Sequence, residues 1–132
     1  NLGTILRSAD WFGYTHVFMS PDTVDIYNPK VIQSSMSSVF RVQHQYIDLR
    51  ELILANPSAP VYGALLGAPE HSSSEIEKNG LIVLGNESRG ISTENHDLIS
   101  KPFSITSKHS LGAESLNVGV AAGIICAMFK EV

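Results

Sequence analysis

The sequence predicts an α/β domain built on a mainly parallel sheet with helices on both faces. Short β-rich runs alternate with segments of helical periodicity along all 132 residues. The run Leu81–Leu84 is continuously apolar, as expected for a strand of a parallel sheet whose two faces are covered by helices. No internal repeat, low-complexity tract or interior linker divides the chain, so we expect a single domain over residues 1–132.

The first half of the chain reads as two helix–strand pairs followed by a short helix. Asn1 is a good N-cap, apolar residues then recur at helical spacing, and Gly13 closes the pattern. Thr15–Ser20 is a β-rich run that ends in a Pro-Asp turn. The other elements expected here are a helix over 29–39 opened by Asn28-Pro29, an alternating strand over 41–47, and a helix over 49–55 between Asp48 and Pro57.

The second half contains three further expected strands and ends in a helix. VYGALL (61–66) and the run Leu81–Leu84 read as strands, and residues 70–80 between them form a polar surface loop with a helical turn. Ser92-Thr93-Glu94 is typical of a capped helix start. We expect one more strand over 102–106 and a helix rich in Ala and Gly from Ser115 to the end.

Composition limits the class of protein and its partners. With 43% hydrophobic and 17% charged residues, the chain resembles an ordinary soluble globular domain. The net charge of −4 argues against a bulk electrostatic grip on nucleic acid, but it leaves room for a local basic patch. Six basic residues lie near the segments discussed below: Arg7, Lys30, Arg41, Arg89, Lys101 and Lys108.

Cysteine content and hydropathy predict a cytoplasmic location without membrane contact. Cys126 is the single cysteine and cannot form an intrachain disulfide, which fits a reducing compartment. The longest apolar run, Val118–Phe129, is well short of the roughly 20 residues of a membrane span, and no signal peptide is visible. The chain opens on Asn1 rather than Met, so we expect a domain of a longer protein.

Three polar clusters stand where an open parallel sheet places its ligands, beyond the carboxyl ends of strands. They are NLGTILRSA (1–9), LGNESRG (84–90) and ESLNVGVAAG (114–123). Each has a purely structural alternative. Asn1, Ser115 or Asn117 would serve only as a helix cap, and Arg7 would only pair with Asp10 three residues on.

Glu87 is harder to explain structurally, because a solubilising charge does not need a turn bounded by Gly85 and Gly90. The turn lacks the Lys-Ser/Thr of a phosphate loop, and G-x-G-x-x-G is absent. No metal site is expected, since His16, His44, His71, His96 and His109 are scattered. A nucleophile triad stays open, although Ser115 lacks the G-x-S-x-G elbow, and Cys126 is expected to pack rather than react.

The order and content of the three clusters resemble the three motifs of the SpoU (TrmH) family of RNA 2′-O-ribose methyltransferases in the SPOUT superfamily. Residues 1–9 match Asn-x-Gly, three residues, Arg, x, Ala throughout. Residues 84–90 match an apolar strand end followed by Gly-Asn-Glu-x-x-Gly, and 115–118 match Ser-Leu-Asn-Val. Ser88, Gly119 and Lys101-Pro102-Phe103 depart from the usual pattern, and the last of these puts the cofactor contacts there in doubt.

The resemblance implies a C-terminal trefoil knot, S-adenosyl-L-methionine as cofactor, a tRNA or rRNA substrate and a homodimer. It also implies that the strand that usually precedes the first motif, and any accessory RNA-binding domain, lie outside residues 1–132. The implied catalytic residues are Asn1, Arg7, Glu87, Ser115 and Asn117. The implied cofactor-binding residues are Ala64, Leu65, Leu84, Gly85, Asn86, Gly90, Lys101, Phe103 and Leu116, and the RNA-binding ones are Arg7, Lys30, Arg41 and Arg89.

Physical chemistry refines these roles. An arginine is charged at every ordinary pH and is a poor base, so Arg7 is expected to bind an RNA phosphate or to lower the pKa of the ribose hydroxyl. Asn1, Ser115 and Asn117 would orient the ribose, and Glu87 would fix Asn1 or Arg7 rather than act as base. Arg89 would face RNA or the partner subunit. The alternative function is a catalytically weak, cofactor-binding module for RNA binding or assembly; an unrelated nucleotide-binding enzyme is disfavoured.

Overall fold

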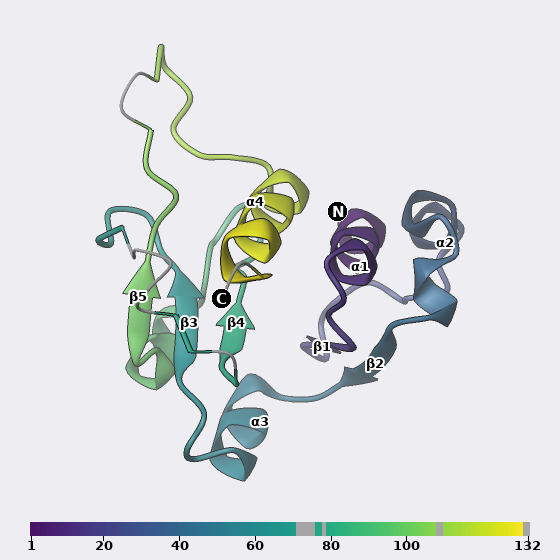
Figure 1. The fold of residues 1–132 in the computed structure, drawn as a ribbon, viewed down its shortest axis with the longest axis horizontal. Helices are drawn as coiled ribbons and strands as arrows, with labels where there is room; N and C mark the ends of the chain where they lie inside the picture. Colours follow the sequence, from purple (N-terminus) through teal and green to yellow (C-terminus); the bar gives the residue numbers. More distant parts are fainter. Residues whose placement is uncertain (71–75, 78, 108–109, 131–132) are drawn as a thin grey trace.

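The structure, a computed structural model, describes residues 1–70, 76–77, 79–107 and 110–130. Helices and strands alternate along the chain, as Figure 1 shows. In chain order the elements are α1 (Leu2–Trp11), β1 (His16–Met19), α2 (Pro29–Ser35), the 3₁₀ helix η1 (Ser38–Phe40), β2 (Gln43–Tyr46), α3 (Leu49–Ala55), β3 (Val61–Ala64), β4 (Leu81–Val83), the 3₁₀ helix η3 (Thr93–Leu98), β5 (Lys101–Phe103) and α4 (Val118–Lys130).

Every strand pair in the described residues is parallel, which confirms the predicted α/β class. β1 pairs with β2 from His16↔Gln43 to Met19↔Tyr46. The second sheet has the order β4-β3-β5, with Ala64 opposite Phe103 at the carboxyl end of β3. The carboxyl ends of β3, β4 and β5 therefore lie along one edge, where the loops that follow them come together.

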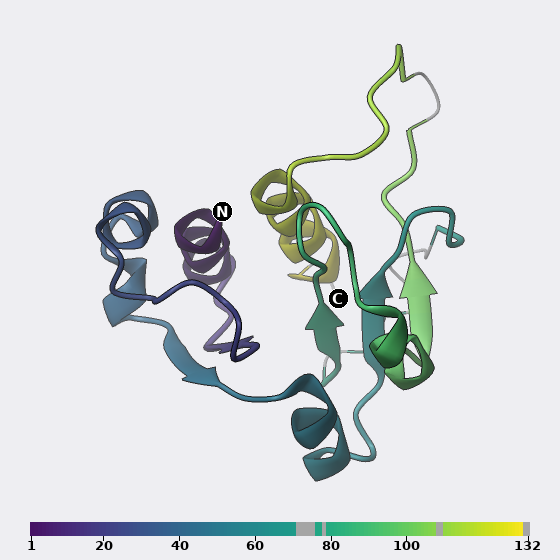
Figure 2. The same ribbon diagram turned by 180° about the vertical axis from the view of Figure 1, so that it is seen from behind.

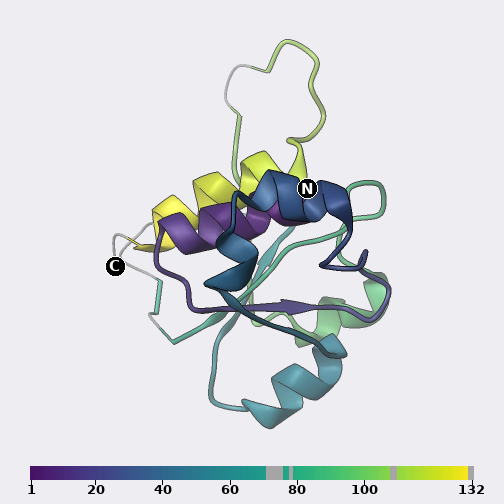
Figure 3. The same cartoon turned by 90° about the vertical axis from the view of Figure 1, so that its right-hand side faces the viewer.

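Helices cover both faces of the β4-β3-β5 sheet, as predicted. Figure 3 shows α4 along one side of the strands and α3 and η3 along the other. Alternate residues of β3 explain this layering, because successive side chains of a strand point to opposite faces. Tyr62 packs with Phe103 and Ile125 beneath α4, whereas Val61 packs with the α3 side chains Leu49 and Ile53.

The core beneath α4 is aromatic. Tyr62 and Phe103 are both 0% exposed, and complete burial of one such ring stabilises the fold by about 2–3 kcal/mol. Phe129 of α4 meets Tyr62 edge-on, with 4.9 Å between ring centroids, and lies 5.4 Å from Phe103. This cluster fixes α4 against the sheet.

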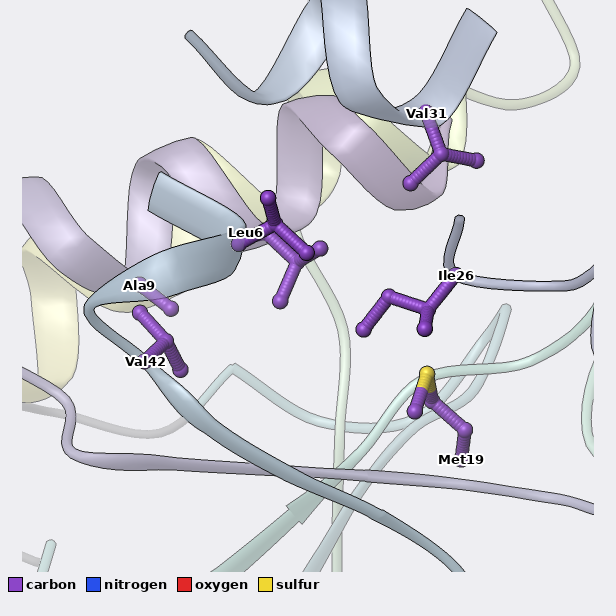
Figure 4. Close-up of a cluster of buried hydrophobic side chains, with 7 residues drawn as sticks. Leu6, Ala9, Met19, Ile26, Val31 and Val42 are labelled. Carbon is purple, nitrogen blue, oxygen red and sulfur yellow. The ribbon is translucent and has the colours of Figure 1, made fainter. Parts of the chain in front are cut away.

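The β1-β2 sheet has its own core beneath α1. Figure 4 shows Leu6 and Ala9 of α1 pointing toward Met19, Ile26, Val31 and Val42, which come from β1, α2 and the loops beside them. Figures 1 and 2 both show α1 between α2 and α4, and it contacts both helices. The Tyr14 hydroxyl, just beyond α1, donates to the carbonyl oxygen of Cys126 in α4 at 3.2 Å. The first helix of the chain is thus locked beside the last.

Several predicted boundaries shift. The helix expected over 29–39 ends at Ser35, because Met36 and Ser37 adopt left-handed backbone angles (φ 48° and 70°) and a short 3₁₀ helix follows. The helix expected from Ser115 begins at Val118. The helix start expected at Ser92 is a 3₁₀ helix whose N-cap Ser92 makes no side-chain capping bond. The strand expected over 102–106 spans Lys101–Phe103.

Some expectations fall outside the described residues. They include most of the polar loop expected over 70–80, the basic residue Lys108, and His71 and His109. Among the helices that the structure describes, none combines the length and the apolar character needed to cross a membrane.

Candidate active site

The turn after β4 is a closed loop built by residues 85–90. Asn86 and Gly90 exchange two backbone hydrogen bonds of 3.0 and 2.8 Å. The Asn86 side-chain oxygen also accepts from the backbone N–H and the hydroxyl of Ser88, each at 2.9 Å. Gly90 has a left-handed φ of 66°, and a Cβ on Gly85 would lie 2.3 Å from the Gly90 carbonyl carbon. Both glycines are therefore required by the turn itself, and the turn holds Glu87 at its tip.

The side chain of Asn1 joins this turn to the last helix. Its amide nitrogen donates a short hydrogen bond to the Glu87 carboxylate. Its amide oxygen accepts from the Asn117 amide nitrogen at 2.8 Å. Asn1 precedes α1 but makes no side-chain capping bond there, so its side chain is committed to these two partners. One residue from each predicted motif meets the others in a single hydrogen-bonded chain.

Asn117 completes the chain by capping α4. Its side-chain oxygen accepts from the backbone N–H groups of Gly119 at 2.9 Å and Val120 at 3.2 Å. Asn117 is therefore a helix cap, but not only a cap, because the same side chain also contacts Asn1. A cap uses only the amide oxygen, which leaves the nitrogen free to donate.

Electrostatics agree with an organising role for Glu87. The hydrogen bond from Asn1 lowers the pKa of the Glu87 carboxyl below its ordinary value. A carboxylate that is fully ionised near neutral pH accepts hydrogen bonds well but is a weak general base. The chain Glu87–Asn1–Asn117 is thus set up to hold amide groups in place.

Arg7 lies on the exposed side of α1, and its guanidinium has no hydrogen bond or ion pair within the described residues. The alternative pairing with Asp10 is wrong, because Asp10 binds Arg41 instead. The Nε of Arg41 donates to Asp10 at 2.8 Å, and the Ser38 hydroxyl donates to the same carboxylate oxygen at 2.7 Å. These hydrogen bonds, that of Arg41 first, lower the pKa of Asp10. Within the described residues the Arg7 guanidinium is therefore available to a ligand, whereas the Arg41 guanidinium is already paired with Asp10.

Two of the loops at the carboxyl edge of the β4-β3-β5 sheet are bonded to one another. The backbone N–H of Leu65 donates to the Phe103 carbonyl at 2.8 Å. Ser104 donates its backbone N–H to Pro69 at 3.1 Å and its hydroxyl to the Ala68 carbonyl at 2.6 Å. Sequence reasoning missed Ser104, although a polar residue directly after an apolar strand at this edge is a recognisable signal.

The predicted cofactor residues divide by position. Ala64, Leu65, Leu84 and Phe103 lie at the carboxyl ends of their strands. Phe103 is 0% exposed and its carbonyl oxygen already accepts from Leu65, so the structure does not present this residue to a cofactor. Lys101 lies at the opposite end of β5, beside Tyr62, and its ammonium is 3.7 Å from Glu77. Most of the predicted cofactor-binding residues therefore lie at the carboxyl edge of the β4-β3-β5 sheet, and the Lys101 side chain does not.

The remaining predicted residues are exposed. Ser115 and Leu116 lie in the segment before α4, and Leu116 is 49% exposed. Lys30 is exposed in the first turn of α2. Arg89 lies within electrostatic range of Asp22, whose pKa is lowered first by Ser20 and more weakly by the charge of Arg89.

Metal ligands and thiols were the other chemistry to consider. In the part of the chain that the structure describes, no group of three or more His, Cys, Asp or Glu side chains is placed to hold a metal ion. Burial raises the pKa of the Cys126 thiol to about 11, which suppresses the reactive thiolate.

Comparison with known proteins agrees with this geometry. The model of the SpoU rRNA Methylase family matches residues 1–127. The chain belongs to the SpoU rRNA methylase family. As in the sequence prediction, all three motifs of this SpoU domain lie inside the matched range.

One relative of this SpoU chain is named as a ribosomal RNA methyltransferase. It is 35% identical over 130 residues to the Bacillus subtilis 23S rRNA (guanosine(2553)-2′-O)-methyltransferase RlmP, covering 95% of this chain and 51% of that enzyme. A TrmH-family structure from Porphyromonas gingivalis aligns with a TM-score of 0.85 at 36% identity, over 98% of this chain and 54% of that one. The SpoU methyltransferase AviRb from Streptomyces viridochromogenes, solved with AdoMet, aligns with a TM-score of 0.81 at 25% identity, over 98% and 54%. The chain therefore spans about half the length of these relatives.

Proposed function

We propose that residues 1–132 are the catalytic domain of an S-adenosyl-L-methionine-dependent RNA 2′-O-ribose methyltransferase. The observation that carries the proposal is the hydrogen-bonded chain Glu87–Asn1–Asn117, which brings the three motifs of the family to one place. The name of the Bacillus subtilis relative supports a ribosomal RNA substrate, with tRNA as the second arm of the test.

The site must hold a ribose 2′-hydroxyl in line with an electrophilic methyl group and help remove its proton. S-adenosyl-L-methionine, when bound, supplies that methyl on a sulfonium sulfur. Arg7 binds an RNA phosphate beside the reacting hydroxyl, because its exposed guanidinium has no partner among the described residues and matches phosphate in two-pronged geometry. Asn117 and Ser115 orient the ribose, and Glu87 holds Asn1 in place as a positioning residue.

The exposed apolar residues near the carboxyl edge suit the flat adenine ring of the cofactor. Leu66 is 80% exposed and Leu116 is 49% exposed on the loops that follow β3 and precede α4. Large exposed apolar side chains near one edge favour a partly apolar ligand. Ala64, Leu65, Leu84 and Gly85 would hold it through their backbone. Asn86 and Gly90, bonded to each other, would shape the turn around it.

We also propose two finer features of the family for this chain. The C-terminal part is threaded as a trefoil knot, which is supported by β3 lying between β4 and the later β5 and by the return of α4 beside α1. Two copies form a homodimer through α4, where Val120 (52% exposed) and Ile124 (38% exposed) are one turn apart. Sedimentation of Val120→Asp as a monomer, with wild type as a dimer, would support the dimer; an unchanged dimer would contradict this interface.

Transfer of labelled methyl by the complete protein tests the activity. We expect a 2′-O-methylated nucleotide in ribosomal RNA and a loss of about 100-fold or more for Arg7→Ala, with cofactor binding retained. The conservative Arg7→Lys variant keeps the charge but loses the two-pronged contact, and it should recover only part of the rate. Calorimetric binding of the cofactor without transfer to either ribosomal RNA or tRNA would instead establish the weakly catalytic module.

A further inference from the structure

We propose that an open groove on the outer side of the α2–β2 layer holds one unpaired RNA nucleotide, with its base stacked on Tyr27 and Phe40. The inference rests on the proposed function, because it takes RNA as the substrate. The groove has a volume of about 500 Å³ and lies where β2, η1 and the segment before α2 meet. Figures 1 and 3 show this layer at the side of the molecule away from β3 and β5.

Both aromatic rings are unusually open. Tyr27 is 62% exposed and Phe40 is 72% exposed, and both line the same groove. Rings of this size normally bury most of their surface, so an exposed pair points to a ligand with a π face.

The two rings are also held on fixed backbone. The Tyr27 N–H donates to the Asp25 carboxylate at 2.9 Å, and the Phe40 N–H donates to the Ser37 carbonyl at 3.1 Å. The His44 ring lies edge-on to Tyr27, with centroids 6.2 Å apart. Preorganised rings bind a base at little cost in side-chain entropy.

The polar groups of the groove suit a base better than a phosphate. Arg41 lies in the groove, but its guanidinium is already bonded to Asp10, so its attraction for phosphate is reduced while its plane is held still. Nδ1 of His44 is 3.2 Å from the Val42 carbonyl, which only accepts, so Nδ1 donates there and Nε2 is the ring nitrogen left for the edge of a base.

A nucleobase also explains the groove better than a protein segment does. The described residues that line it include Arg41, Gln43 and His44 but no carboxylate, although the whole chain carries a net charge of −4. An apolar segment would bury the polar ends of Gln43 and His44 without offering them partners, whereas the edge of a base has donors and acceptors for them. The chemistry of the groove therefore favours an unpaired nucleotide.

Anisotropy with a labelled single-stranded RNA of about 12 nucleotides, and with the matching blunt duplex, tests the inference in the complete protein. Tyr27→Ala and Phe40→Ala should each weaken single-strand binding by about 5- to 100-fold. Tyr27→Phe, which keeps the ring, should bind within about 2-fold of wild type. The control is Leu54→Ala, which removes another large exposed apolar side chain (69% exposed) on α3 and should change nothing.

The outcomes are distinct. If both alanine variants bind single-stranded RNA as wild type does, the inference is overturned. Methyl transfer by wild type in the same experiment would leave the proposed function intact. A change in sedimentation without a change in RNA affinity also overturns it and makes the groove a protein contact. If an alanine variant does not fold, photocrosslinking of 5-iodouridine RNA to wild type decides: adducts on Tyr27 or Phe40 support the groove, and adducts only elsewhere overturn it. A wild type that binds and methylates no RNA refutes the proposed function itself.

Discussion

Asn117 makes two separable interactions, and two substitutions measure them one at a time. Its amide oxygen caps α4 by accepting from Gly119 and Val120, and its amide nitrogen donates to Asn1. Asn117→Ala removes both. Asn117→Asp keeps the acceptor, and adds a favourable negative charge at the start of α4, but removes the donor.

The expected magnitudes follow from these contacts. Loss of an N-cap costs about 1 kcal/mol. The bond to Asn1 joins exposed side chains, where water can replace it, so its loss adds only about 0.5 kcal/mol. Asn117→Ala should therefore lower the free energy of unfolding by about 1.5 kcal/mol, and Asn117→Asp should stay within about 0.5 kcal/mol of wild type.

Urea denaturation followed by circular dichroism measures both stabilities, and labelled-methyl transfer measures the site. Because both variants lack the donor to Asn1, both should lose methyl transfer although only one loses stability. Equal destabilisation of the two variants would refute the cap argument. Full activity of the Asp variant would refute the role of the Asn1–Asn117 bond.

Four further outcomes follow from other contacts. The difference in unfolding free energy between wild type and Glu87→Gln should be present at pH 7 and shrink below about pH 4.5. The reason is that the pKa of Glu87 is lowered in the folded state, so its stabilisation is lost as the folded carboxylate is protonated. A pH-independent difference would contradict the stabilising role of the Glu87 carboxylate. Gly85→Ala should destabilise by about 3 kcal/mol in chemical denaturation, since its Cβ would meet the backbone of Gly90 and Ile91 within 2.6 Å; an unchanged midpoint would show that the turn relaxes. Ser37→Gly should raise stability by about 0.5–1 kcal/mol, because φ is 70° there; a loss in thermal melting would contradict this. Cys126 should react with thiol reagents at pH 8 far more slowly than a free thiol, since its pKa is about 11; rapid labelling of the native protein would contradict the burial argument.

Periodicity predicted the elements that are decided locally. The order of helices and strands and the turn at Gly85–Gly90 depend on residues within a few positions of one another. The parallel pairing joins distant residues, and it was predicted from the alternation of strands with helices. The end of α2 was mispredicted because Met36 and Ser37 are not residue types that signal a left-handed backbone. Glycine usually occupies that conformation, and other residues adopt it rarely.

The partners within the site needed tertiary structure. Asp10 and Arg7 are helical neighbours, yet Asp10 binds Arg41, 31 residues away, and no local pattern marks that choice. Asn117 shows a related limit, since local reasoning offered the cap and the site contact as alternatives. An amide has separate donor and acceptor groups, so both descriptions hold at once.

The hydrogen-bonded chain Glu87–Asn1–Asn117 joins residues that are synthesised at different times. Its two links span 86 and 116 residues, so each closes a very long loop. During synthesis Asn1 leaves the ribosome before the rest of the domain. Asn117 leaves near the end, immediately before α4. Contacts of such separation form late and slow the search for the native state. A chain that has not yet docked its last helix therefore lacks the Glu87–Asn1–Asn117 contacts, so the candidate site is assembled only when the fold is completed.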